Sequence, residues 1–498
     1  MSIKNNLYNI FGGAGRAILF LFTIPLMVNY MGVEKFGVWA LITSIGNIAL
    51  MLDVGIASTT MHFVSEINAL ETKEDVDYKT KTIIPVLLLI NIVLSAIVAI
   101  SFLFFTTEIA HVFLNNSLVS DDIIIALRWI GLYSSIMLIQ HLFSGIIQAY
   151  NQFLLVNIIK FINIFVINVG LLVFSFLEED FVTLTFYMFL ISILTLITYI
   201  YLASKKLNIF KIKPHFDYQT TKTIISYSGT TWVGYFGSVI FTQFDKIIIG
   251  KITTPEILGI YAAIISITSY ISSIATVGLQ PIIPKLTEYW TKVKTHRDEF
   301  VKEYKHAIQF NTFLIFFASL LMLIVYRVLL KDIMDINLEV YPDSILAFQL
   351  AIVIYAFNSL SIPGFYTLMA IKKTKHIGLW QLLGSFLALY CIYLLGQSFG
   401  LYGVIIGNIG LVITSMFNFI TAKIVVKNPV EWLKYIYKPI LIFSVTISLI
   451  LLVANVYLDA IFAMIASVLL MVWYFKQQPE LLNIITNVIN KKKKEALE

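Results

Sequence analysis

The chain has 498 residues, of which 59% are apolar and only 13% are charged, and its formal net charge is +6. Charged residues make up about a quarter of a soluble globular domain, so this composition excludes a soluble domain and indicates a polytopic membrane protein. The single cysteine, Cys391, excludes internal disulfides and cysteine-based metal sites.

A helix needs roughly 20 apolar residues to cross the bilayer core, which is about 30 Å thick. Fourteen stretches of the sequence meet or approach this length, and the last two are the shortest. In chain order they are residues 10–28, 36–60, 83–106, 123–147, 153–176, 182–203, 224–249, 257–279, 307–330, 344–370, 377–395, 400–424, 439–454 and 460–475. The sequence therefore predicts an all-α membrane protein with about fourteen transmembrane helices.

The Lys and Arg residues are unevenly distributed among the gaps between these stretches. Of the 35, 27 fall at the two ends and in alternate gaps, five fall inside or near the stretches, and three fall in the other gaps: Lys35, Lys251 and Lys331. Positive residues accumulate on the cytoplasmic side of membrane proteins, so both termini are expected in the cytoplasm. These anchors account for the positive net charge, and we expect no nucleic-acid partner.

Two further features bear on the inner side of the membrane. The first apolar stretch is not followed by a small-residue cleavage site, so we expect it to be a retained helix. Residues 284–306 have apolar side chains at near-helical spacing with lysines between them, which predicts a helix lying on the inner membrane surface.

A short segment recurs in the second half of the chain. Glu34-Lys-Phe-Gly-Val-Trp-Ala40 and Glu256-Ile-Leu-Gly-Ile-Tyr-Ala262 share Glu, Gly, an aromatic residue and Ala at the same spacing, 222 residues apart. The same offset, within one residue, relates the inner ends of later stretches, such as Ala149 with Ala370. The repeat predicts two halves of similar structure.

The halves are expected to be parallel, because six crossings return the chain to its starting side. We therefore predict a six-helix lobe over residues 1–210, a second over 211–430, and two additional transmembrane helices with a basic cytoplasmic tail over 431–498. Repeated halves of this kind typically flank a central substrate site in transporters.

Ionisable residues at membrane depth are costly and are functional candidates by default. Arg16 and Asp53 lie on the first two predicted helices at depths that differ by roughly 5 Å, given a rise of 1.5 Å per residue, so they can face one another. The pair fits either a site for a substrate diphosphate or a permanent structural ion pair.

Three more ionisable residues are candidates for substrate binding. Lys160, near the inner end of the fifth stretch, either lines a cavity or extends to the inner headgroups. Asp245 and Lys246, in the seventh stretch, either take part in binding and gating or form an interfacial pair. Polar side chains on the same helices either line a wet lumen for sugar hydroxyls or join helices by hydrogen bonds; they are Gln140, His141, Asn157, Asn163, Asn168 and Gln243. Pro363-Gly364 is a predicted hinge.

Several of these residues form a pattern that resembles a known family. The pattern comprises Asn9, Gly12-Gly-Ala-Gly15, Pro25, Gly32, Gly37, Asp53-Val-Gly55, Phe244-Asp245-Lys246-Ile-Ile-Ile-Gly250 and Gly259-Ile-Tyr261-Ala262. It resembles the polysaccharide-transporter branch of the multidrug/oligosaccharidyl-lipid/polysaccharide superfamily, and more narrowly a Wzx-type flippase. The resemblance implies a MATE-like fold and alternating access around a central, often cationic cavity. It also implies transfer of undecaprenyl-diphosphate-linked oligosaccharide across the bacterial cytoplasmic membrane.

Two other functions stay open on the sequence alone. A cation-coupled multidrug exporter of the same superfamily should favour uncompensated acids, whereas Asp53 and Asp245 both have basic neighbours. A membrane polymerase or ligase of lipid-linked glycans should need a large outer loop, and the longest here has about sixteen residues, 107–122. No nucleotide-binding loop, catalytic triad or metal-ligand cluster is visible. We therefore expect a transporter rather than an enzyme, with no cofactor, surrounded by membrane lipids and coupled to protons or sodium ions.

Overall fold

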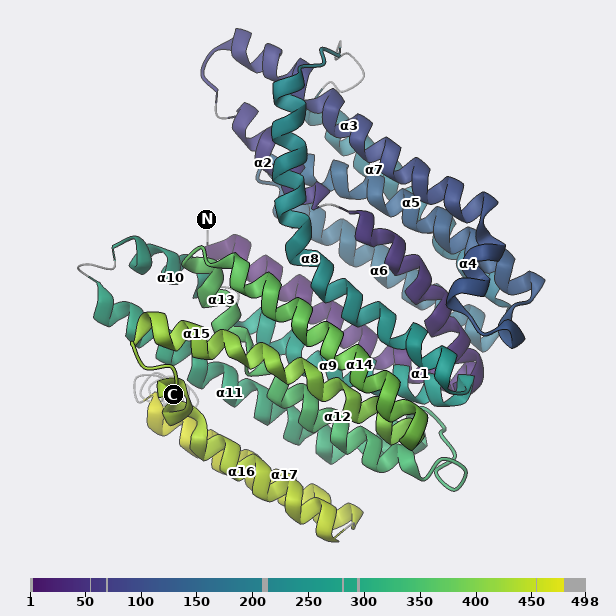
Figure 1. The fold of residues 1–498 in the computed structure, drawn as a ribbon, viewed down its shortest axis with the longest axis vertical. Helices are drawn as coiled ribbons and strands as arrows, with labels where there is room; N and C mark the ends of the chain where they lie inside the picture. Colours follow the sequence, from purple (N-terminus) through teal and green to yellow (C-terminus); the bar gives the residue numbers. More distant parts are fainter. Residues whose placement is uncertain are drawn as a thin grey trace, which may run out of the picture. The chain divides into compact units, whose positions relative to one another are not determined.

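The computed structural model describes residues 3–53, 55–68, 70–207, 214–279, 282–292, 296–453 and 455–478, except for the side chains of 3–18, 230–235, 237, 238, 241, 284 and 456. Every regular element in these ranges is helical (Figure 1). The predicted all-α class is confirmed.

The α-helices have the following bounds in chain order: α1 Ile3–Ala49, α2 Ile56–Asn68, α3 Lys73–Phe104, α4 Thr106–Phe113, α5 Asp121–Ala149, α6 Phe153–Phe176, α7 Phe181–Lys206, α8 Tyr218–Ile252, α9 Pro255–Leu279, α10 Ile282–Thr291, α11 Arg297–Val328, α12 Asp343–Ser359, α13 Ile362–Ala370, α14 Thr374–Gly407, α15 Met416–Val425, α16 Glu431–Val453 and α17 Val456–Gln477. Short 3-10 helices occupy Leu50–Leu52, Asn116–Leu118 and Asn408–Ser415, and a π-helical turn occupies Leu329–Ile333.

Short polar side chains start many of these helices. Ser120, Asp180 and Asp217 accept hydrogen bonds from backbone amides in the first turns of α5, α7 and α8, and Thr72 and Asn455 do so for α3 and α17. The first amides of a helix have no partner within the helix, so such a cap stabilises its start by about 1 kcal/mol. These caps fix the residues at which the five helices begin.

Eleven helices of the described part are long and apolar enough to cross a membrane. Two of the eleven each join a pair of predicted stretches through a glycine with left-handed backbone, Gly32 (φ 76°) and Gly400 (φ 53°). α8 coincides with the predicted stretch 224–249 but is not among the eleven. The number of fourteen crossings stays a prediction.

The predicted stretch 36–60 is not one continuous helix. α1 ends at Ala49 and α2 begins at Ile56. Asp53 lies in the gap, where its Oδ1 accepts the Ile56 N–H at 2.9 Å, and Gly55 has a φ of 67°. Asp53 caps the start of α2, and a glycine with left-handed backbone interrupts a helix, so these two residues explain the break.

The single surface helix that we predicted over residues 284–306 is wrong. α10 ends at Thr291, and α11 begins at Arg297 and continues into a long spanning helix. Asp298 and Glu299 lie in the first turn of α11, where acidic side chains stabilise a helix start. The second half of the predicted surface helix therefore belongs to a transmembrane element.

The described chain forms two compact units, which are treated separately here. The first comprises Met1–Ile267, Ile333–Ala347 and Gly378–Leu411. Within it, α5 packs against α2, α3 and α7, which run beside it in Figure 1. Polar side chains join these helices: Asn91 donates to the Leu138 carbonyl at 3.1 Å, and Gln140 donates to the Ser192 carbonyl at 2.8 Å. Gln140 thus serves helix packing, one of its two predicted roles.

The repeated segments meet each other within this unit. A Cβ on Gly37 of α1 would lie 2.9 Å from Gly259 N of α9, and a Cβ on Gly259 would lie 3.1 Å from Gly37 N. Each would also overlap a carbonyl oxygen, of Pro255 and of Val33 respectively, and these two residues are again 222 apart. Gly37 thus meets Pro255, and Gly259 meets Val33, so the contact is reciprocal, as it is between elements related by a two-fold rotation. The predicted lobe boundaries stay a prediction.

The second unit comprises Thr268–Asp332, Phe348–Ile377 and Val412–Glu498. In it α12 ends at Ser359 and α13 begins at Ile362, beside the predicted hinge. The carbonyls of Ser359 and Leu360 accept the side-chain amides of Asn311 and Asn418. Interruptions of a transmembrane helix are tolerated when neighbouring side chains satisfy the released backbone groups, and these two asparagines do so.

The last two helices, α16 and α17, form a hairpin packed on α11 in the second unit (Figure 1). The carboxylate of Asp459 on α17 accepts a hydrogen bond from Tyr326 OH at 3.1 Å and lies 3.5 Å from the Arg327 guanidinium. The side chain of Asp459 is buried, so the ion pair ties α17 to α11 in an apolar setting.

Candidate functional site

Two cavities in the first unit contain most of the ionisable residues singled out by the sequence. We call them the Lys246 cavity, of about 400 Å³, and the Asp53 cavity, of about 370 Å³. They follow one another along the same elements: Asn47 lines the first, Leu50 and Met51 line the second, and Gln243 and Val239, one turn apart on α8, line one each.

The wall of the Lys246 cavity combines aliphatic, aromatic and polar side chains and carries one charge. Lys246 is the only ionisable side chain apart from tyrosine among its described lining residues. Its amide- and hydroxyl-bearing lining residues come from five helices; they are Thr43, Ser44, Asn47, Tyr133, Ser134, Asn163, Asn168, Gln243 and Ser266. Asn163, Asn168 and Gln243 line a cavity, as one of the two predicted readings requires. Asn163 and Asn168 also accept hydrogen bonds from Thr195 of α7 and Thr23 of α1, so they join helices as the other reading requires. Amide and hydroxyl groups of this kind can bind the hydroxyl groups of a ligand.

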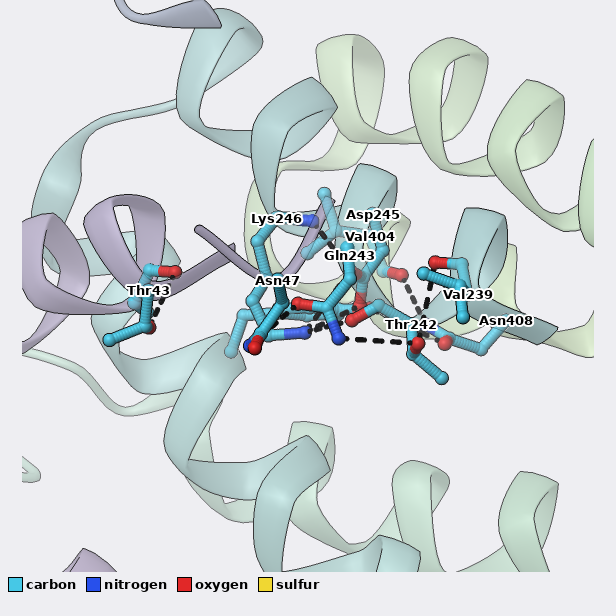
Figure 2. Close-up of polar contacts among 11 residues, drawn as sticks. Thr43, Asn47, Val239, Thr242, Gln243, Asp245, Lys246, Val404 and Asn408 are labelled. Carbon is cyan, nitrogen blue, oxygen red and sulfur yellow. Dashed lines mark hydrogen bonds and ion pairs between the residues drawn. The ribbon is translucent and has the colours of Figure 1, made fainter. Parts of the chain in front are cut away.

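Lys246 and Asp245 have different surroundings although they are neighbours in the sequence. The Lys246 Nζ lies 3.1 Å from Asp245 Oδ1 and donates to the Thr242 carbonyl at 2.8 Å (Figure 2). Asp245 is buried, and Tyr261 OH donates to its Oδ2 at 3.0 Å. Tyr261 in turn contacts Asn408. Asp245 does not line either cavity, so it acts behind Lys246 by holding the ammonium in place.

Figure 2 also shows a chain of amide and hydroxyl contacts beside Lys246. Asn47 donates to Gln243 Oε1 at 3.4 Å, and Gln243 donates to Thr242 Oγ1 at 3.3 Å. The chain links α1 to α8 across the wall of the Lys246 cavity. These hydrogen bonds are long, so the same groups can turn to a ligand at low cost.

The Asp53 cavity brings together residues that are far apart in the sequence. Asp53 pairs with His141 Nδ1 of α5 through Oδ2, while its Oδ1 caps α2. Lys160 of α6 lines the same cavity. Asp53, His141 and Lys160 are its charged or titratable side chains among the described lining residues.

The structure gives Asp53 a different partner from the one we predicted. The side chain of Arg16 lies outside the described residues, so the proposed Arg16–Asp53 contact stays a prediction. His141 takes the position opposite the carboxylate. The sequence singled out His141 as a polar residue on the fourth stretch and as a candidate for proton coupling, but no spacing rule connects it with Asp53, 88 residues away. The break after α1, which turns the carboxylate toward α5, was the missing information.

Neither cavity has the groups expected of a hydrolytic or metal-dependent site. Among the described residues, no group of three or more His, Cys, Asp or Glu is placed to hold a metal ion. The arrangement consists of hydrogen-bonding walls, two lysines and one carboxylate–imidazole pair. It can bind and release a polar ligand and exchange a proton.

Comparisons with known proteins agree with this geometry. The family model described as "Polysaccharide biosynthesis protein" matches residues 2–290, more than half of the chain. The chain belongs to this family. A Shigella flexneri protein whose provisional name is O-antigen transporter is 21% identical over 405 residues, which are 80% of this chain and 92% of that protein.

Two solved structures share the fold. An inward-facing multidrug-resistance transporter of the MATE family, in the MOP superfamily, matches with a TM-score of 0.69 and 13% identity, over 82% of this chain and 95% of that one. The lipid II flippase MurJ in an inward closed conformation matches with a TM-score of 0.69 and 16% identity, over 96% and 99%. The predicted MATE-like fold is confirmed, and the chain is a multi-pass membrane protein.

Proposed function

We propose that the chain is a flippase that moves undecaprenyl-diphosphate-linked oligosaccharide from the inner to the outer leaflet of the bacterial cytoplasmic membrane, for O-antigen or capsule-like surface polysaccharide. The observation that carries this is membership of the polysaccharide biosynthesis family, together with likeness to a relative named as an O-antigen transporter over most of both chains. The fold alone does not distinguish a flippase from a drug exporter, because both kinds of structure match it equally well.

The topology of the proposed flippase follows from its charges. The 27 Lys and Arg residues in the end segments and alternate gaps favour a cytoplasmic location for both termini. The loaded lipid then enters from the side on which α6 begins, close to Lys160. Its head group leaves on the side of the turn at Gly32. The two lobes, 1–210 and 211–430, would rock about this path.

The cavities supply the contacts that such a head group needs. Asn and Gln side chains of the Lys246 cavity would bind sugar hydroxyls, while Lys160 and Lys246 would bind the diphosphate as point charges. Arg16 is proposed as a third ligand of the diphosphate, with Asp53 as the acid from which it is released. Asp245 is proposed as the partner that positions Lys246.

We propose the proton as the coupling ion. Imidazole ordinarily exchanges a proton near neutral pH, and His141 shares the Asp53 cavity with one carboxylate and one ammonium, Lys160. A proton taken up by the His141–Asp53 pair would change the charge of the path through which an anionic head group passes. A sodium site would need several oxygen ligands around the carboxylate, and the described partners of Asp53 are an amide and an imidazole.

Deletion of the gene in its host tests the function. The flippase requires loss of a surface glycan and accumulation of the polyprenyl-linked unit inside the cell, and a plasmid copy should reverse both. Unchanged glycan with new sensitivity to cationic dyes would refute the flippase in favour of a drug exporter. Complete units that reach the outer face but never polymerise would point to a polymerase or ligase instead.

Charge-removing variants test the site in the same strain. Lys160→Gln and Lys246→Gln should each lower the rate of glycan export about tenfold or more, because a hydrogen bond to a charged group contributes about 1.5–3 kcal/mol. Arg128→Gln is the matched control, since Arg128 is exposed on α5 and lines neither cavity. Normal export by both lysine variants at wild-type protein levels would remove these residues from the proposed site.

A further inference from the structure

A third cavity, of about 220 Å³, lies in the second unit among α11, α16 and α17. Three lysines line it: Lys305 of α11 and Lys434 and Lys438 of α16. No acid is among its described lining residues. We propose that this Lys434 cavity binds the phosphate of an anionic phospholipid of the inner leaflet. The proposal rests on the membrane topology above and not on the flippase activity.

The charge of the cavity is not balanced by its surroundings. Lys434 lies 2.9 Å from the carboxylate of Glu431, one turn earlier on α16. Lys305 and Lys438 contact aromatic faces instead, at 5.4 Å from the Tyr435 ring centroid and 5.8 Å from the Tyr437 ring centroid. Within the described part of the chain neither of these two ammonium groups has a carboxylate partner. Two lysines without a carboxylate partner in the described chain thus line a space with room for an anion.

A neighbouring cavity shows that a lysine in the wall of a cavity of this unit can have a carboxylate partner. It is about 350 Å³ in size, it also adjoins α11 and α17, and it contains Lys285 and Glu303. The ammonium of Lys285 lies 3.4 Å from the carboxylate of Glu303. That lysine already has its anion, whereas Lys305 and Lys438 need one from outside the described chain.

The depth of the Lys434 cavity suits a lipid head group. The two α16 lysines lie in its first turns, and Trp473 and Gln477 lie in the last turns of α17. Trp473 is buried, and Gln477 accepts a hydrogen bond from Gln309 at 3.1 Å, which joins α17 to α11 in the wall of the cavity. Aromatic and basic side chains mark the membrane interface, and basic pockets between helices on the cytoplasmic side bind lipid head groups.

The surface next to the cavity provides for acyl chains. Lys434, Lys438, Leu441, Val445 and Leu449 follow one another at three- or four-residue spacing, so they share one face of α16. The three apolar residues of this series are exposed, Leu441 to 62%. A ligand with a phosphate at the lysines and hydrocarbon along this face is a phospholipid rather than free phosphate. A 220 Å³ cavity is smaller than ordinary ligand pockets of about 300–1,000 Å³, so the oligosaccharide of the flippase substrate would not fit.

The test uses the full chain, purified in a neutral detergent and stripped of lipid, with short-chain phosphatidylglycerol as the probe and native mass spectrometry as the readout. Lys305→Gln/Lys438→Gln should weaken phosphatidylglycerol binding about tenfold or more, because it removes both ammonium groups that have no carboxylate partner and that would attract the lipid phosphate. Lys302→Gln/Lys423→Gln is the control with the same change in charge, since both lysines are exposed and line no described cavity. It should bind like the wild type.

Three competitors identify the source of the phosphate. Phosphatidylcholine and inorganic phosphate should leave phosphatidylglycerol in place, and polyprenyl diphosphate should displace it only at higher concentration. Displacement by inorganic phosphate would overturn the lipid assignment, and displacement by polyprenyl diphosphate at lower concentration would assign the cavity to the substrate. Equal binding by both double variants would overturn the site itself. Equal unfolding temperatures of the lipid-free variants will show that each variant is folded.

Discussion

At the scale of single residues, Asp53 links local backbone geometry to chemistry. An unpaired charge at membrane depth costs several kcal/mol. Asp53 avoids this cost in two ways, because one carboxylate oxygen receives the first amide of α2 and the other pairs with His141. The positive end of the α2 dipole adds to the stabilisation. The residue that breaks the helix therefore also supplies a carboxyl group to the wall of a cavity.

The His141–Asp53 pair predicts a proton-dependent transport rate. In proteoliposomes carrying a fluorescent lipid-linked oligosaccharide, an imposed pH gradient should change the rate of translocation by the wild type, and a sodium gradient should not. His141→Gln should abolish the response to the pH gradient, because it removes the imidazole from the described lining of the Asp53 cavity and replaces it with an amide, which has no titratable group.

His111→Gln serves as the control for this experiment. His111 lies on α4 and contacts Asn116, away from both cavities. A response that survives His141→Gln, or a wild type driven by sodium alone, would contradict proton coupling through this pair.

At the scale of elements, polar breaks and glycine crossings decide how the helices pack. Both breaks are satisfied by polar side chains. At the first, Asp53 accepts the Ile56 amide through one carboxylate oxygen and pairs with His141 of α5 through the other. At the second, Asn311 and Asn418 of other helices donate to the released carbonyls. Gly37 and Gly259 do the opposite, because they bring α1 and α9 into backbone contact by having no side chain.

The glycine crossing predicts that even one methyl group is too large at this point. Gly37→Ala and Gly259→Ala should each lower the free energy of unfolding by about 1–3 kcal/mol, the usual cost of overpacking, although alanine intrinsically favours a helix. The double variant should cost less than the sum, because both methyl groups act on one contact. Thermal unfolding of the purified protein measures this.

Gly229→Ala is the matched control, since a Cβ on Gly229 of α8 meets nothing within 4 Å. It should leave stability unchanged or raise it slightly. If Gly37→Ala proved as stable as Gly229→Ala, the close crossing of α1 and α9 would be wrong.

What the sequence could predict at this scale follows from the range of each signal. Hydropathy is local and strong over twenty residues, so the predicted stretches fall on helices. It misses polar first turns, and α3, α11 and α16 therefore begin eight to ten residues before the predicted stretches. Side-chain partners are not local: the spacing of Asp53, His141 and Lys160 carries no periodic signal, and only the observed packing of α2, α5 and α6 brings them together. The surface helix at 284–306 failed because lysines between apolar residues fit both a surface helix and the first turns of a long spanning one.

At the scale of the whole molecule, the repeat and the charge asymmetry describe one arrangement. The offset of 222 residues relates Val33 to Pro255 and Gly37 to Gly259. The structure brings Gly37 against Pro255 and Gly259 against Val33. A parallel repeat requires an even number of crossings between equivalent points. The gaps flanking each half must therefore lie on one side of the membrane, which is the side that carries the lysines.

The parallel repeat and the distribution of lysines predict the side of the membrane on which two exposed positions lie. The test uses a Cys391→Ser background, which is otherwise free of cysteine. Ser117→Cys, in the turn Asn116–Leu118 between α4 and α5, should react with an impermeant maleimide in intact cells. Lys373→Cys, in the exposed turn between α13 and α14, should react only after the membrane is permeabilised. The gap with Ser117 contains no Lys or Arg, whereas the gap with Lys373 contains three, and membrane insertion retains such charges in the cytoplasm. Labelling in the reverse order would invert the topology and, with it, the proposed direction of transport.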